Sequence, residues 1–185
     1  MDYEVREPPK EEPLTLSDTK IYLRTIAGET VEDNAVIEPL ITAAREFAEN
    51  VTGRALAKQT IAAYPTEFEQ TIQLPRAPVN SIKSITAIGE DGARVEISAD
   101  DYLLSSMGDV YMLRIPDIRV RAARPIEIVY EAGYSTPPKL IRQAMLLLIG
   151  HWYINREAVI AGSTTAVEVP LAARTLLNQY KRWWC

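Results

Sequence analysis

The chain has 185 residues, of which 47% are hydrophobic and 24% charged, and its formal net charge is −5. This composition is that of an ordinary globular protein and excludes wholesale disorder, and the acidic balance argues against a surface that binds nucleic acid over its whole extent. One cysteine, Cys185, excludes a disulfide within the chain and a cysteine-based zinc site, and one histidine, His151, makes a Ser-His-Asp triad depend on a single residue.

Membrane and targeting signals are weak. The longest apolar run, Ala144 to Ile149, is far shorter than the roughly 18 residues that a membrane span needs. Met1 is followed by acidic residues and prolines instead of a basic segment and an apolar core, so we expect no signal peptide. The cytoplasm is therefore the default compartment.

Residues 1–13 have a composition of their own. They hold five acidic residues and three prolines, and almost no large apolar side chain. Such a segment gains too little from burial to offset the entropy of ordering, so we expect an extended N-terminal arm.

Two helices are predicted within residues 14–57. The first begins at the capping-box-like Thr15-Leu16-Ser17-Asp18 and ends at Gly28. The second is expected from about Glu32, with a kink at the interior Pro39. Its charged side chains, Arg45 and Glu49 among them, are assigned to the face opposite an apolar stripe of Ile37, Leu40, Ile41, Ala44, Phe47, Ala48 and Val51.

From residue 58 to 134 the hydrophobic period changes to two, which predicts a β insertion of short strands. A turn at Gly89-Glu90-Asp91-Gly92 joins two of them, and prolines mark edges or loops. The strands are expected near 60–64, 71–74, 82–88, 95–97, 110–115 and 126–130.

Residues 135–180 predict two further helices. The first is apolar almost all round, which indicates a central helix or a subunit interface, and Pro170 opens the second. The candidate packing residues of the first of these two helices are Leu147, Leu148, His151 and Trp152. We therefore expect an α+β, mainly helical fold: a four-helix core from 14–57 and 135–180, with the β insertion between helices 2 and 3 and a tail at 181–185.

A cluster of arginines is a candidate contact with DNA in a channel or with a neighbouring subunit. A solvated strand edge is the third possibility, and we favour the solvated or subunit-contact interpretation because charge runs are usually solvated. The cluster consists of Arg114, Arg119, Arg121 and Arg124, opposed only by Asp117.

The tail is a candidate interface with a partner. Two adjacent tryptophans cannot share one helix face, and exposed aromatics beside basic residues are typical of interface anchors. The alternative is that they fold back onto the chain's own helices. The residues concerned are Lys181, Arg182, Trp183 and Trp184.

Candidates for chemistry are few. His151 lies on the apolar stripe without a second ligand at helical spacing, so we interpret it as a core or interface histidine and expect no metal site. Asp100 and Asp101 can in principle perform acid–base catalysis, but turn formation before Tyr102 is the favoured interpretation.

Several segments are more informative in their order than any one is alone. They are Leu14 to Arg24, Ile41 to Phe47 with Thr52 to Leu56, Leu74 to Val79, Tyr130-Glu131-Ala132-Gly133-Tyr134, and the helix Ile141 to Ala158 with its Trp-Tyr and Asn-Arg-Glu pattern. In this order they resemble the head–tail connector, or head-completion adaptor, proteins of tailed phages. The resemblance covers residues 14–182, and Pro39 and the Trp183-Trp184-Cys185 ending depart from the pattern.

The resemblance implies a structural role without catalytic residues or cofactor. Such proteins form a ring, usually twelvefold, below the portal of a DNA-filled head, extend the DNA channel and present a platform for the stopper or tail. It implies that the C-terminal segment contacts the portal, that DNA passes without sequence-specific binding, and that the protein resides in the virion neck after assembly in the host cytoplasm.

Two functions of other classes remain as alternatives. One is a cytoplasmic enzyme that uses carboxylates such as Asp100 and Asp101. The other is a monomeric DNA-binding module whose affinity depends on Arg119 and Arg121.

Overall fold

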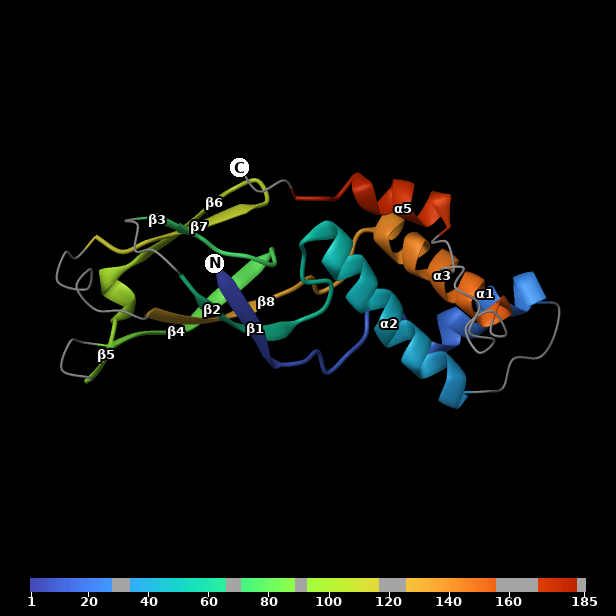
Figure 1. The fold of residues 1–185 in the computed structure, drawn as a ribbon, viewed down its shortest axis with the longest axis horizontal. Coiled ribbons are helices and arrows are strands. Elements are labelled where there is room, and N and C mark those ends of the chain that lie inside the picture. Colours follow the sequence, from blue (N-terminus) through green and yellow to red (C-terminus); the bar gives the residue numbers. More distant parts are fainter. Residues whose placement is uncertain (28–33, 66–70, 89–92, 117–125, 156–169, 183–185) are drawn as a thin grey trace, which may run out of the picture. The chain divides into compact units, whose positions relative to one another are not determined.

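The structure is a computed structural model, which describes residues 1–27, 34–65, 71–88, 93–116, 126–155 and 170–182 (Figure 1). The chain forms two compact units. Residues 1–10 and 57–135 make up the first, here called the β unit. Residues 11–56 and 136–185 make up the second, here called the helical unit.

The prediction of a mainly helical fold with a four-helix core is wrong. The chain is α+β, and within the described residues its strands form two antiparallel sheets in a unit separate from the helices. The physical reason is that the strands bury an apolar core of their own, so the β insertion is a second folded body and not a decoration on a helical bundle.

The larger sheet has five strands in the order β1-β2-β8-β4-β5, and every neighbouring pair is antiparallel. Their bounds are β1 Asp2–Glu7, β2 Gln59–Tyr64, β8 Ile126–Ala132, β4 Val79–Ile88 and β5 Arg94–Glu96. The smaller sheet has the order β3-β7-β6, and η1, a short 3-10 helix, precedes β6. These bounds are β3 Thr71–Gln73, η1 Ala99–Asp101, β6 Leu103–Met107 and β7 Val110–Arg114.

Buried and partly exposed side chains alternate along β8, whereas the first five residues of β2 are all buried. Ile61 of β2 lies opposite Tyr130 of β8, Ala63 lies opposite Ile128, and all four side chains are fully buried. The buried phenol of Tyr130 donates a hydrogen bond of 2.7 Å to the carbonyl of Pro75. The buried hydroxyl of Tyr130 therefore has a hydrogen-bond partner within the protein, as a buried tyrosine requires.

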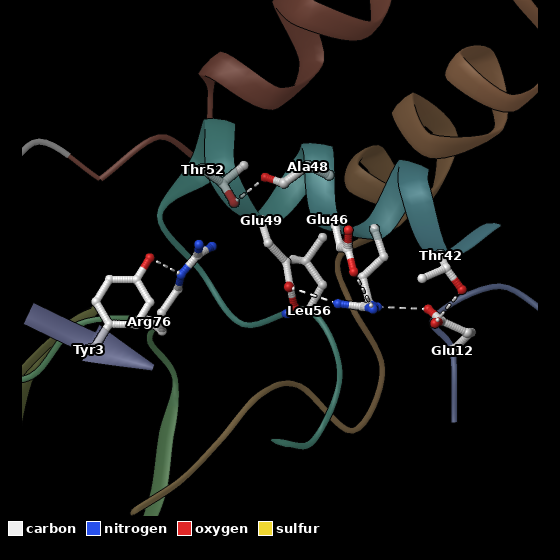
Figure 2. Close-up of polar contacts among 10 residues, drawn as sticks. Tyr3, Glu12, Thr42, Glu46, Ala48, Glu49, Thr52, Leu56 and Arg76 are labelled. Atoms are coloured by element: carbon white, nitrogen blue, oxygen red, sulfur yellow. Dashed lines mark hydrogen bonds and ion pairs between the residues drawn. The ribbon is translucent and has the colours of Figure 1, made fainter. Parts of the chain in front are cut away.

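Residues 2–7 of the N-terminal segment form β1, which pairs with β2. Tyr3 and Val5 alternate with charged residues, which is the period of a strand. The guanidinium of Arg76 lies 5.2 Å from the centre of the Tyr3 ring, and its Nε donates to the phenol at 2.8 Å (Figure 2). This contact ties β1 to the segment between β3 and β4.

The helical unit contains α1 Leu16–Ala27, α2 Asn34–Thr52, α3 Lys139–Ile154 and α5 Leu171–Asn178. The predicted cap of the first helix is confirmed, because Thr15 Oγ1 accepts a hydrogen bond of 3.0 Å from the amide of Asp18. The rings of Phe47 in α2 and Trp152 in α3 meet edge to face, with centroids 6.3 Å apart.

We predict that Gly133→Ala destabilises the β unit severely. Gly133 has φ +123°, a backbone conformation that residues with a side chain rarely adopt. A Cβ at this position would lie 2.1 Å from the carbonyl oxygen of Ala57. Backbone strain and the clash together are expected to lower the free energy of unfolding by more than about 3 kcal/mol. Urea denaturation followed by circular dichroism measures this change.

Gly108→Ala is the matched control. Gly108 also has a positive φ, +61°, but a Cβ there meets nothing within 4 Å. Only the cost of the left-handed conformation, about 1–2 kcal/mol, is expected. Equal losses in the two variants would show that the close approach to Ala57 is unimportant.

Candidate functional site

A buried ion-pair network organises α2. The guanidinium of Arg45 lies 3.0 Å from the carboxylate of Glu49, and each side chain is only 7% exposed. Arg45 Nε also donates to Glu12 at 2.9 Å, and Thr42 Oγ1 donates to the other oxygen of Glu12 at 3.0 Å (Figure 2). Arg45 and Glu49 belong to the charged face that the sequence predicts for this helix, yet both are buried, and each neutralises the charge of the other.

Glu49 has a second role in this network. Its Oε1 accepts a hydrogen bond of 2.8 Å from the amide of Leu56, which follows the end of α2 (Figure 2). Glu12 precedes α1, and Leu56 is the last residue of this segment of the helical unit. The network thus fixes both chain segments to one turn of α2.

The C-terminal residues 180–182 are held to the end of α2, and we call them the C-terminal anchor. The amide of Arg182 donates to the carbonyl of Thr52 at 3.0 Å, and Arg54 Nε donates to the carbonyl of Tyr180 at 2.8 Å. The guanidinium of Arg54 lies 5.8 Å from the centre of the Tyr180 ring, within range of a cation–π contact.

Of the predicted interface residues, the structure describes only Lys181 and Arg182. Lys181 is exposed, whereas Arg182 is buried. Trp183 and Trp184 lie outside the described residues.

The predicted packing residues of α3 differ in their surroundings. Leu148 is fully buried, while Leu147, His151 and Trp152 are partly exposed. His151 Nδ1 lies 3.2 Å from the side-chain amide nitrogen of Asn155, which also donates to the carbonyl of His151 at 2.8 Å. This local contact orients the imidazole along its own helix.

Arg114 is the one member of the arginine cluster within the described residues, where it is exposed at the end of β7. Arg119, Arg121 and Arg124 lie outside them. Asp100 and Asp101 are exposed in η1. In the part of the chain that the structure describes, no group of acidic, histidine or cysteine side chains could hold a metal ion, and no helix is long and apolar enough to cross a membrane.

Charged side chains from β1 form a network on the polar face of the larger sheet. Tyr64 Oη lies 2.6 Å from Arg6 Nη2 and 2.9 Å from Glu4 Oε1, and Arg6 also pairs with Glu127. Burial raises the pKa of Tyr64, and the hydrogen bond to Tyr64 raises the pKa of Arg6. The network ties β1 to strands β2 and β8.

A second group of contacts holds the end of β1. Glu7 accepts hydrogen bonds from Thr60 Oγ1 at 2.7 Å and from Lys83 Nζ at 3.2 Å. The hydrogen bond from Thr60, followed by the bond and the charge of Lys83, lowers the pKa of Glu7. These contacts were not predicted from the sequence, although the alternation within residues 2–7 is a visible signal for a strand.

Comparison with known proteins gives one family and several similar folds. The family described as "HCP: Head completion protein" matches residues 14–183, which include parts of both units. None of the curated proteins is similar enough in sequence to count as a relative.

Three solved structures from gene transfer agent (GTA) particles share the fold. A chain of the "Neck of empty GTA particle computed with C6 symmetry" has a TM-score of 0.77 and 18% identity, covering 100% of this chain and 97% of that one. A chain of the "Virion of native gene transfer agent (GTA) particle" gives 0.78 and 20%, with the same coverage. A chain of the "Neck of native GTA particle computed with C12 symmetry" gives 0.64 and 20%, covering 95% and 96%.

We predict that Arg45→Met lowers the free energy of unfolding by about 3–5 kcal/mol, because it leaves Glu49 charged and buried. The double variant Arg45→Met with Glu49→Gln is expected to cost clearly less than the sum of the two single changes. Urea denaturation of all three variants measures the coupling.

Glu46→Gln is the control for this experiment. Glu46 also faces Arg45, but at 3.5 Å and with its side chain 62% exposed, so its loss should cost less than about 1 kcal/mol. Additive effects of Arg45→Met and Glu49→Gln would contradict the assigned ion pair.

We predict that Glu7→Gln destabilises the protein at neutral pH and has little effect in acid. Because folding lowers the pKa of Glu7, its carboxylate adds stability above the ordinary glutamate pKa of about 4.3, and this is lost as the pH falls through the folded value. Urea denaturation at pH 7 and at about pH 3 tests the prediction. Glu96→Gln on β5 is the control, with no effect expected, and a loss from Glu7→Gln that persists in acid would refute the carboxylate's role.

Proposed function

The chain belongs to the head completion protein family, and we infer that it is a structural adaptor joining head to tail in a tailed phage or phage-like particle. The observation that carries this inference is the family match across residues 14–183, which takes in nearly all of the helical unit and all of the β unit except residues 1–10. A structural role in the particle, with no chemical reaction, is what the family implies.

The proposed arrangement is a closed ring below the portal. The similar chains come from neck structures computed with C6 and C12 symmetry, and the likeness to them extends over almost the whole chain. A ring of identical copies closes through a head-to-tail interface, which leaves a lumen on its axis. Twelve copies, a portal on one side and a stopper or tail-completion protein on the other complete the proposal.

The C-terminal segment is the proposed contact with the portal. The C-terminal anchor fixes the backbone at Arg182 onto the end of α2, and Lys181 beside it is exposed. Trp183 and Trp184 follow directly in the sequence and supply the aromatic side chains typical of interface hot spots.

DNA is proposed to pass through the lumen without sequence-specific binding. The net charge of −5 suits a channel that must not hold its cargo, because each phosphate contact adds to affinity. Arg114, Arg119, Arg121 and Arg124 are proposed to contact a neighbouring subunit or the DNA. The leucine at the start of α5, Leu171, is 80% exposed and is a further candidate for subunit packing.

The test is attachment to DNA-filled, portal-bearing heads that lack a tail. We expect the full-length protein to join them as a ring visible by electron microscopy and to reduce DNA leakage. A variant ending at residue 182 removes the tryptophans and keeps the C-terminal anchor, so it should join heads at less than about a tenth of normal occupancy, as expected for the loss of interface anchors.

Circular dichroism and urea denaturation of the truncated variant provide the control for folding. Normal occupancy of the truncated variant would disprove the portal contact of the tail while leaving the adaptor function intact. Failure of the full-length protein to join heads would refute the adaptor function itself.

A further inference from the structure

The larger sheet ends in two strands whose outer edges have no partner strand within the described residues, β1 and β5. Every residue of both strands is exposed. Val5 on β1 and Val95 on β5 are 48% and 51% exposed. An edge strand presents unpaired amide and carbonyl groups, which can pair with a strand of another chain.

The two edges present matching side chains on matching faces. Val5 lies opposite Ile61 of β2, and Val95 lies opposite Ala87 of β4. Through β8 these partners belong to the same face, since Ile61 pairs with Tyr130 and Ala87 with Ile126, four residues apart. Val5 and Val95 therefore share the core face of the sheet.

Charged residues take the opposite face at both edges. Glu4 and Arg6 flank Val5, and Arg94 and Glu96 flank Val95. Within the described residues, no ion pair engages Arg94 or Glu96, whereas Arg6 and Glu4 pair with each other at 2.6 Å and remain about half exposed. Along the chain the charges run from negative to positive on β1 and from positive to negative on β5.

The strand directions decide how two copies can meet. Four successive antiparallel pairings separate β1 from β5, so these two strands run in the same direction. Rotation about a ring axis that runs along the strands preserves this direction. The β5 edge of one copy then meets the β1 edge of the next in parallel.

We propose that β5 of one copy pairs in parallel with β1 of the neighbouring copy, so that the larger sheets join across each junction of the ring. Parallel pairing places Arg94 opposite Glu4 and Val95 opposite Val5, and it brings Glu96 next to Arg6, which lies at the irregularity of β1 between Val5 and Glu7. The antiparallel alternative centred on the valines opposes Arg94 to Arg6 and Glu96 to Glu4, and like charges directly opposite each other are destabilising. This proposal rests on the proposed function, because it takes a ring of identical copies as given.

The contact is heterologous, as ring closure requires, because different surfaces of the two copies meet. With three residues in β5, the shared ladder is short. It fixes register and direction, while other surfaces supply the remaining buried area. Because each copy contributes both edges, the short ladder is repeated at every junction, and it sets the same register between all neighbouring copies.

The test is disulfide trapping in the assembled ring. Val5→Cys and Val95→Cys are combined in a chain that also carries Cys185→Ser, assembled on portal-bearing heads and oxidised mildly. Directly opposed residues of neighbouring strands lie close enough for a disulfide. We expect a ladder of covalent oligomers on a non-reducing gel, and no ladder when Val5→Cys is combined instead with Met107→Cys, which is exposed on β6 of the other sheet.

The outcomes separate this proposal from the proposed function. Attachment to heads at normal occupancy without a ladder overturns the edge pairing and leaves the adaptor function standing. Failure of the unmodified protein to attach refutes the function.

If the cysteine pair prevents assembly, charge exchange tests the same contact. Arg94→Glu alone, or Glu4→Arg alone, should weaken assembly by about two- to fivefold per junction, and the two together should restore it. Absence of rescue in the combined variant, with each variant folded by circular dichroism, overturns the edge pairing.

Discussion

The buried pair of Arg45 and Glu49 is the interaction on which the helical unit depends. Removing two charges from water is costly, and the cost is offset only when each has further partners. Here those partners are Glu12 on one side and the amide of Leu56 on the other. The network therefore attaches two chain segments, at Glu12 and at Leu56, to one turn of α2. Each segment lies next to a boundary between the two units.

In the β unit, the N-terminal strand β1 has little apolar surface to hold it on the sheet. Polar contacts hold β1 on the sheet: Arg6 with Tyr64 and Glu127, and Glu7 with Thr60 and Lys83. Because most of the charged side chains in these contacts are exposed, each contact is individually weak, and together with the backbone ladder they define the register. The same charges keep the outer edge of β1 hydrophilic, which limits unspecific strand addition.

Sequence patterns predicted the elements better than their assembly. The helices and most strands follow from periods of 3.6 and two, and the Thr15 cap from its residue type. Strand β1 did not follow, because average composition hides the alternation of Tyr3 and Val5. The burial of Arg45 and Glu49 depends on residues distant in sequence, and the division of the chain into two units depends on a core of the β unit that is visible only after folding. The family resemblance identified the function, which local chemistry alone left open among three classes.

Both units are discontinuous in the sequence: β1 adds an N-terminal segment to the β unit, and the stretch 57–135 divides the helical unit. The β unit needs residues from 1–10 and from 57–135, and the helical unit needs residues on both sides of that stretch. During synthesis, α1 and α2 emerge long before α3, so their apolar faces must wait for partners about a hundred residues away. Such distant pairings slow folding, because the chain closes long loops before any contact stabilises them. The apolar face of α2 therefore lacks its partner on α3 until the later part of the chain has been made.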